Sequence, residues 1–119
     1  MILLWMGIIV GALIVSVVLV KVMSGASGTT SAAVKEKIRQ GAMTLDVRTP
    51  AEYQSGHYTG AKNIPLQELE GRLAELGDKN RAIVIYCASG MRSAKAAHIL
   101  TGAGFADVTN AGGLSNLKP

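Results

Sequence analysis

The first twenty residues of the chain carry no charged side chain, and this feature constrains its fold more than any other. Within Met1–Val20, only Trp5 and Ser16 carry a polar group. About 20 residues of helix extend roughly 30 Å, which matches the hydrocarbon core of a bilayer. A domain of this size could not cover such a helix on all sides. The segment predicts a transmembrane helix over residues 1–23, with a cleaved signal peptide as the alternative because small residues follow it.

Positive charges predict how this helix is oriented. The basic residues nearest to the span all follow it: Lys21, Lys35, Lys37 and Arg39. Lys and Arg next to a span tend to remain in the cytoplasm, so we expect a single-pass membrane protein whose folded domain faces the cytoplasm. Gly7 and Gly11 form a G-x-x-x-G spacing that would allow a homodimer through the helix, although glycine is common in membrane helices in any case.

Residues 24–30 read S-G-A-S-G-T-T and predict a flexible linker, so a domain is expected over residues 31–119. Within it, segments of strand and helix character alternate at short intervals. Strands are expected at 43–47, 61–64, 82–86 and 107–110, and helices at 32–40, 50–54, 66–76 and 92–102. This alternation predicts an α/β domain of three layers, in which a mostly parallel sheet is flanked by helices.

Residues that could carry chemistry stand at the carboxyl ends of two of these strands. Asp46 and Arg48 end the first strand, and Cys87 ends the apolar strand A-I-V-I-Y. In parallel sheets, ligands bind at this end of the strands. Cys87 is the one cysteine of the chain, which excludes an internal disulfide and a C-x-x-C motif.

The segment C-A-S-G-M-R, Cys87–Arg92, connects the buried strand to a helix. Its backbone N–H groups can point inward and form an anion-binding nest around the sulfur. A helix N-terminus and a nearby arginine both lower the pKa of a thiol, so Cys87 is predicted to react as a thiolate. Gly90 permits the turn, Arg92 offers a planar fork to oxyanions, and Lys95 adds positive charge at the mouth.

Several motifs occur together in one order along the chain. They are Asp46-Val47-Arg48, Glu52-Tyr53, Gly56-His57, Gly60-Ala61, Asn63-Ile64-Pro65, Cys87 to Arg92-Ser93, and Gly112-Gly113. From about Ser31 to Gly113 the chain therefore resembles a single-domain rhodanese. The resemblance implies a sulfurtransferase in which Cys87 takes a sulfane sulfur from a small-molecule donor such as thiosulfate, forms a persulfide and passes the sulfur to a thiol or cyanide-type acceptor.

The resemblance also implies roles around the cysteine. The amides of Ala88, Ser89, Gly90, Met91 and Arg92 would bind the persulfide, and Asp46 and Arg48 would support this loop. Two other functions stay open. One is a weakly catalytic binding module that presents or senses a persulfide for a membrane partner. The other is a cysteine phosphatase, although that class resembles C-x5-R and this chain has the shorter C-x4-R.

Other functional classes find no support in the sequence. The net charge of +4 is spread among mixed signs, without a basic run or interleaved aromatic residues, so nucleic acid is not an expected partner. No metal or organic cofactor is predicted. His57 belongs to the Gly-His motif and His98 lies in the middle of a predicted helix, so neither is expected to act as a general base.

Overall fold

Four parallel strands form the centre of the computed structural model, which describes residues 31–117. The strands are β1 (Met43–Asp46), β2 (Lys62–Asn63), β3 (Ala82–Cys87) and β4 (Asp107–Gly113). Their spatial order is β2-β1-β3-β4, and each neighbouring pair is parallel. The predicted α/β fold with a parallel sheet is therefore confirmed.

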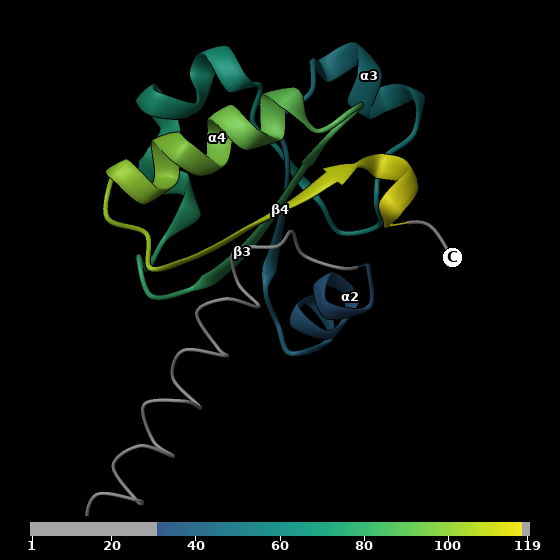
Figure 1. Ribbon diagram of the computed structural model, residues 1–119. Coiled ribbons are helices and arrows are strands. Elements are labelled where there is room, and N and C mark those ends of the chain that lie inside the picture. Colours follow the sequence, from purple (N-terminus) through teal and green to yellow (C-terminus); the bar gives the residue numbers. More distant parts are fainter. Residues whose placement is uncertain (1–30, 118–119) are drawn as a thin grey trace, which may run out of the picture.

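Helices cover both faces of this sheet (Figure 1). Helix α4 (Met91–Gly102) and the 3-10 helix η1 (Leu66–Leu76) lie on one face, and α2 (Ser31–Arg39) lies on the other. Helix α3 (Pro50–Ser55) lies near the start of α4, beyond the end of β3, and the short 3-10 helix η2 (Leu114–Asn116) follows β4. The three predicted layers are thus present.

Strand β3 divides the core between the two faces. Its residues from Ile83 to Cys87 are all buried, as expected for a strand covered on both sides. Because successive side chains of a strand point to opposite faces, Cys87 packs on the side of α4 and η1, whereas Tyr86 packs on the side of α2. The sulfur of Cys87 and the ring of Tyr86 therefore face different layers.

The start of α3 agrees with the sequence in detail. The Thr49 hydroxyl accepts a hydrogen bond from the backbone N–H of Glu52 at 3.2 Å. The Thr49 backbone N–H donates to Glu52 Oε1 at 3.2 Å, and Pro50 occupies the first helical position. This reciprocal arrangement is the capping box that T-P-A-E predicts, and it fixes the Glu52 side chain at the start of the helix.

Two elements differ from the expected ones. The leucine-rich segment is a 3-10 helix interrupted at Arg72, where φ is −126°, so its spacing reflects packing and not a continuous α-helix. Strand β4 continues beyond Asn110 to Gly113, with a bulge at Ala111 because Ile85 pairs with Asn110 while Tyr86 pairs with Gly112. Gly-rich segments have low strand propensity, which explains why the sequence did not predict this extension.

The predictions for the amino-terminal part of the chain lie outside the described residues. They are the transmembrane helix over 1–23, the linker over 24–30 and the dimer contact at Gly7 and Gly11. Within residues 31–117, no helix combines the length and the apolar character that a membrane span requires.

Candidate active site

Cys87 occupies the carboxyl end of β3, a central strand, directly before the loop that leads into α4. The residue has no exposed surface. The backbone N–H of Gly90 donates to Cys87 Sγ at 2.9 Å, and the Ser93 hydroxyl lies 3.5 Å from the same sulfur. Gly90 has a φ of +103°, a backbone conformation that side chains disfavour, so glycine allows the loop to curl around the sulfur.

The surroundings of Cys87 act in opposite directions on its ionisation. Burial, the largest single influence, raises the pKa of the thiol, but hydrogen bonds from the Ser93 side chain and from the backbone of Ser93, Gly90 and Ser89 outweigh it and lower the pKa below its ordinary value. The strongest of these hydrogen bonds comes from a side chain and the others from the backbone at the start of α4, while the activation of Cys87 stays a prediction. A lowered thiol pKa increases the fraction of nucleophilic thiolate at neutral pH.

Ser93 connects the sulfur to β4. Its hydroxyl is fully buried and lies 2.6 Å from Asn110 Oδ1 and 3.0 Å from the carbonyl oxygen of Gly90. A hydroxyl carries a single proton, so at a given moment it donates to only one of the acceptors around it, which include Asn110 Oδ1, the Gly90 carbonyl oxygen and a Cys87 thiolate. Asn110 Oδ1 is held in place because it also accepts from the backbone N–H of Gly112 at 2.9 Å. No role was predicted for Ser93 or Asn110, because the two residues lie 17 positions apart and meet only in the folded domain.

The end of β4 packs directly against the loop, and two glycines make this possible. A Cβ atom on Gly113 would lie 2.6 Å from the carbonyl oxygen of Ala88, closer than side chains tolerate. A Cβ atom on Gly90 would lie 3.3 Å from the Cα atom of Gly112. The Gly112-Gly113 motif therefore permits close approach of the end of β4 to the backbone of the loop after Cys87. This packing restricts the conformation of the loop.

Arg92 is engaged by a carboxylate that the sequence did not pair with it. Its Nη1 donates to Glu52 Oε1 at 2.7 Å and its Nη2 to Glu52 Oε2 at 2.9 Å. Hydrogen bonding to Arg92 is the largest influence on Glu52 and lowers the pKa of that carboxyl to about 2, while the same bond raises the pKa of Arg92. The fork that was expected to face an oxyanion is bound to Glu52, 40 residues away along the chain.

Asp46 and Arg48 form a second ion pair, which is buried at the carboxyl end of β1. Arg48 Nη2 donates to Asp46 Oδ2 at 2.7 Å and to the carbonyl oxygen of Gly56 at 2.8 Å. The Tyr86 hydroxyl donates to Asp46 Oδ2 at 2.7 Å. Burial, followed by this hydrogen bond, raises the pKa of Tyr86 to about 12, so the hydroxyl keeps its proton. These bonds tie β1 to β3 and to the segment after α3, while the predicted support of the loop by Asp46 and Arg48 stays a prediction.

The remaining predicted residues lie as follows. Ala88 and Ser89 are exposed at the start of the loop, and Met91 is 75% exposed at the first position of α4. His57 stacks on Tyr53 with ring centroids 3.7 Å apart, and its Nδ1 lies 2.8 Å from the Tyr53 carbonyl oxygen. His98 is exposed in the middle of α4. Among residues 31–117, no group of three or more His, Cys, Asp or Glu side chains could hold a metal ion.

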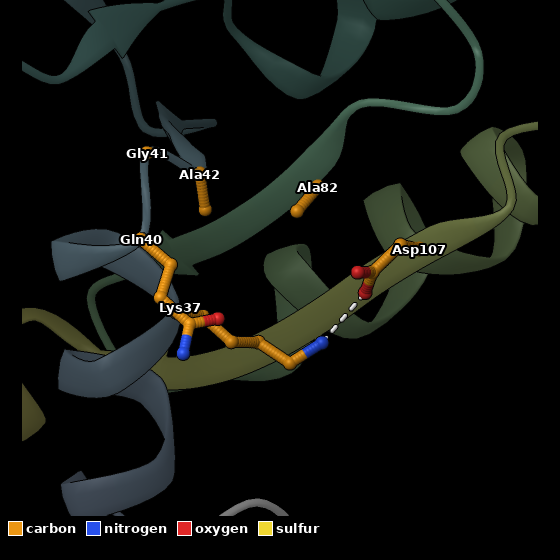
Figure 2. A pocket seen from close by; sticks show the side chains of 6 residues that line it. All are labelled: Lys37, Gln40, Gly41, Ala42, Ala82 and Asp107. Atoms are coloured by element: carbon orange, nitrogen blue, oxygen red, sulfur yellow. Dashed lines mark hydrogen bonds and ion pairs between the residues drawn. The ribbon is translucent and has the colours of Figure 1, made fainter.

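A pocket of about 260 Å³ lies at the opposite end of the sheet (Figure 2). It is lined by the first residues of β3 and β4, Ala82 and Asp107, by Lys37 in the last turn of α2, and by Gln40, which directly follows that helix. Lys37 Nζ and Asp107 Oδ1 lie 2.6 Å apart, so the two charges of the pocket neutralise each other. Because it lies at the amino ends of the strands, this pocket is separate from the loop of Cys87.

The fold and the loop define a class of protein: small parallel α/β domains that hold a buried cysteine between the end of a central strand and the N-terminus of a helix. The model of the rhodanese-like domain matches residues 30–118, and the chain belongs to that family. Thiosulfate sulfurtransferase PspE of Escherichia coli is 45% identical over 74 residues, which are 61% of this chain and 71% of that protein. A sulfurtransferase of Allochromatium vinosum is 38% identical over 68 residues, covering 57% of this chain and 63% of that protein.

Solved structures agree. A rhodanese with anions from E. coli superposes with a TM-score of 0.61 at 43% identity, covering 64% of this chain and 91% of that chain. The human single-domain sulfurtransferase TSTD1, 24% identical, shares the fold with a TM-score of 0.68. These relationships confirm the predicted enzyme class, and the protein is a sulfurtransferase of the rhodanese type.

Proposed function

We propose that the protein transfers a sulfane sulfur from a small donor such as thiosulfate to a thiol or cyanide-type acceptor through a persulfide on Cys87. The observation that supports this most directly is the position of Cys87 Sγ. It lies at the start of α4, 2.9 Å from the Gly90 N–H and 3.5 Å from the Ser93 hydroxyl, in a setting that lowers the thiol pKa. Such a site favours an anionic sulfur without requiring a separate general base.

The proposed cycle has two displacements at sulfur. The Cys87 thiolate attacks the outer sulfur of thiosulfate, a new S–S bond forms, and the old S–S bond breaks with its electron pair leaving on sulfite. The acceptor then attacks the outer sulfur of the persulfide, and the electron pair of that bond returns to Cys87 as thiolate. Cyanide would leave as thiocyanate and a thiol would leave as a persulfide. Each step conserves charge and needs no external oxidant.

Ser93 and Asn110 fit the movement of charge in this cycle. While Cys87 is a thiolate, the Ser93 proton can point to Sγ at 3.5 Å. Once Sγ is bonded to the transferred sulfur, the negative charge lies on the outer atom, and the proton can turn to Asn110 Oδ1 at 2.6 Å. The backbone N–H groups from Ala88 to Arg92 follow Cys87 directly in the chain. As the family resemblance implies, they would bind the outer sulfur.

The decisive measurement is the intact mass of the protein before and after thiosulfate treatment, for the wild type and for Cys87→Ser. We expect the wild type alone to gain the mass of one sulfur atom and to lose it again when cyanide or a thiol is added. A folded wild type that gains no sulfur would contradict the persulfide and would favour the binding module. Hydrolysis of an aryl phosphate that depends on Cys87 would instead favour the phosphatase.

We also propose that residues 1–23 anchor the domain at the cytoplasmic face of a membrane, with Gly7 and Gly11 as the contact of a homodimer. The support is the uncharged stretch and the basic residues that follow it. The full-length protein should sediment with membranes and should resist protease added outside intact cells. Release by carbonate washing, or cleavage from outside, would overturn this topology, and unchanged cross-linking of Gly7→Ile would overturn the dimer contact.

A further inference from the structure

The guanidinium group of Arg92 is the cation of the reactive loop, and an internal anion already occupies it. Both Nη groups of Arg92 donate to Glu52, one to each carboxylate oxygen, at 2.7 and 2.9 Å. This end-on, two-bond geometry is also the one in which a guanidinium binds a sulfonate or sulfate group. A donor oxyanion would therefore compete with Glu52 for the same edge of Arg92.

Glu52 is held in place independently of Arg92. Its Oε1 accepts from the Thr49 backbone N–H at 3.2 Å and lies 3.1 Å from the Thr49 hydroxyl, as part of the capping box of α3. Even at the unperturbed carboxyl pKa of 4.5, Glu52 would be ionised at neutral pH. The competitor is therefore a permanent charge fixed at the start of a helix.

We propose that Glu52 determines which sulfur donors the loop accepts, because it occupies the edge of Arg92 that a donor oxyanion would bind and its own charge repels a doubly charged donor more than a singly charged one. This inference rests on the proposed sulfur transfer and adds the charge class of the donor. The site should prefer donors that carry one negative charge over donors that carry two. Glu52 is then a specificity-determining residue, which acts on the donor through Arg92 and through its own charge.

The charges around the loop favour this preference. The Arg92 charge is balanced by Glu52, and the Arg48 charge is balanced by the buried carboxylate of Asp46. Lys95 is exposed one turn into α4, where water screens its charge. A dianion that approaches the thiolate thus meets little uncompensated positive charge from these side chains. Since Coulomb energy scales with the charge of the donor, the carboxylate of Glu52 disfavours a dianion about twice as much as a monoanion.

Two donors that differ by one charge provide the probe. Thiosulfate carries two negative charges and leaves as sulfite. Methanethiosulfonate has a methyl group in place of one oxygen, carries one negative charge and leaves as methanesulfinate. In both reactions the Cys87 thiolate attacks the terminal sulfur, and the leaving group takes the electron pair of the broken bond. The two reactions therefore differ mainly in donor charge.

The experiment compares Glu52→Gln with the wild type on both donors, with cyanide as acceptor. Glutamine keeps an oxygen for the capping box, so α3 should remain formed. The matched control is Glu75→Gln, which removes the same charge from an Arg72 pair on η1. We expect kcat/KM of Glu52→Gln to rise about tenfold for thiosulfate and about threefold for methanethiosulfonate, mostly through KM, because the electrostatic term doubles with donor charge. The control should leave both values within about twofold.

Salt gives an independent readout, because the advantage of Glu52→Gln on thiosulfate should shrink as ionic strength rises. Equal changes on the two donors, no change, or a fall with thiosulfate would overturn the role of Glu52 while leaving sulfur transfer intact. A wild type that gains no sulfur mass from either donor would overturn the proposed function and this inference together. If Glu52→Gln were less stable, the loss of folded enzyme would lower kcat/KM by the same factor for both donors. The deciding quantity is therefore the ratio of the two kcat/KM values, and an unchanged ratio would overturn the proposal.

Discussion

Two carboxylate–guanidinium pairs lie among the segments that follow the carboxyl ends of β1 and β3, and they differ in burial. In the inner pair, the side chains of Asp46 and Arg48 are 0% and 8% exposed, whereas the side chains of the outer pair, Glu52 and Arg92, are each 33% exposed. Removing one partner of a buried pair leaves an uncompensated charge in the protein, which is strongly destabilising. A partly exposed pair contributes little to stability, so a ligand can exchange one of its partners at small cost.

Similar ion pairs therefore serve two purposes in this domain. The inner pair is local, since its members are two residues apart, and it fastens β1 to Tyr86 and to Gly56. The outer pair joins α3 to the loop across 40 residues and exists only when the domain is folded. We therefore expect changes in the inner pair to affect stability, and changes in the outer pair to affect the choice of donor.

The largest effect should come from breaking the inner pair. Asp46→Asn leaves Arg48 buried without its counter-charge, so the free energy of unfolding should fall by about 3–5 kcal/mol. Chemical denaturation measures this value. Asp107→Asn removes an equal charge from the exposed pair with Lys37 and should cost less than about 1 kcal/mol. Equal losses in the two variants would remove the distinction between buried and exposed pairs.

A smaller loss should follow when the pair is kept and only its neighbour is changed. Tyr86→Phe removes the hydroxyl that donates to Asp46 Oδ2 and that accepts from the Tyr58 backbone N–H at 3.0 Å. Because a partly buried backbone donor loses its acceptor and the buried carboxylate of Asp46 loses a donor, the free energy of unfolding should fall by about 2 kcal/mol. Tyr58→Phe, in a partly buried tyrosine of the same apolar cluster, is the control. A fall as large as that of Asp46→Asn would show that the tyrosine, and not Arg48, supports the carboxylate.

A substitution at Ser93 tests whether the lowered pKa of Cys87 depends on neutral hydrogen-bond donors more than on either ion pair. Ser93→Ala removes the hydroxyl nearest to Cys87 Sγ, so the pKa of the thiol should rise and the pH profile of its alkylation should move to higher pH. At neutral pH, alkylation should slow about tenfold, the scale of one hydrogen bond to a charged group. Ser55→Ala, on α3, should alkylate at the wild-type rate. An unshifted profile in Ser93→Ala would assign the activation to the loop amides alone.

The smallest effect concerns the outer pair in acid. The pKa of Glu52 is about 2 in the folded protein and about 4.5 when unperturbed, so the folded state binds fewer protons than the unfolded chain between these values. The stabilisation by this pair is therefore present above pH 4.5 and is lost as the pH falls toward 2. For a pair this exposed we expect less than about 1 kcal/mol. It is measured as the difference in pH dependence between the wild type and Glu52→Gln, and parallel curves would contradict it.

Sequence reasoning succeeded where local pattern decides structure. The apolar run before Cys87 marked a central strand, and T-P-A-E marked the start of α3, because both signals are complete within a few residues. The loop was located for the same reason. The sequence did not reveal that Arg92 binds Glu52 or that Ser93 lies against Asn110, since these contacts depend on how distant elements pack. Glu52 and Ser93 belong to the motifs, but the residues next to them in the chain do not indicate which distant side chains they contact.

The length of β4 was missed for a different reason. Asn110 to Gly113 has the composition of a turn, yet the strand continues because the backbone of β3 supplies hydrogen bonds to it across the bulge at Ala111. The glycines that weaken the strand signal are required by the close approach of Ala88. Tertiary contact therefore overrides local preference at the point where the sheet meets the loop.

The complete burial of Cys87 affects which sulfur atom, the carried one or that of the cysteine, an incoming molecule meets first. In the proposed cycle, one added sulfur would lengthen the side chain by about 2 Å, so an acceptor would meet the carried atom before it could reach the cysteine itself. Before the sulfur is added, Cys87 exposes no surface, so a donor and an oxidant such as peroxide alike depend on movement of the loop to reach Sγ, and access limits the oxidation of cysteine as much as ionisation does. Burial usually raises the pKa of a thiol, whereas here Cys87 combines complete burial with a lowered pKa because the loop and Ser93 supply hydrogen bonds to the sulfur.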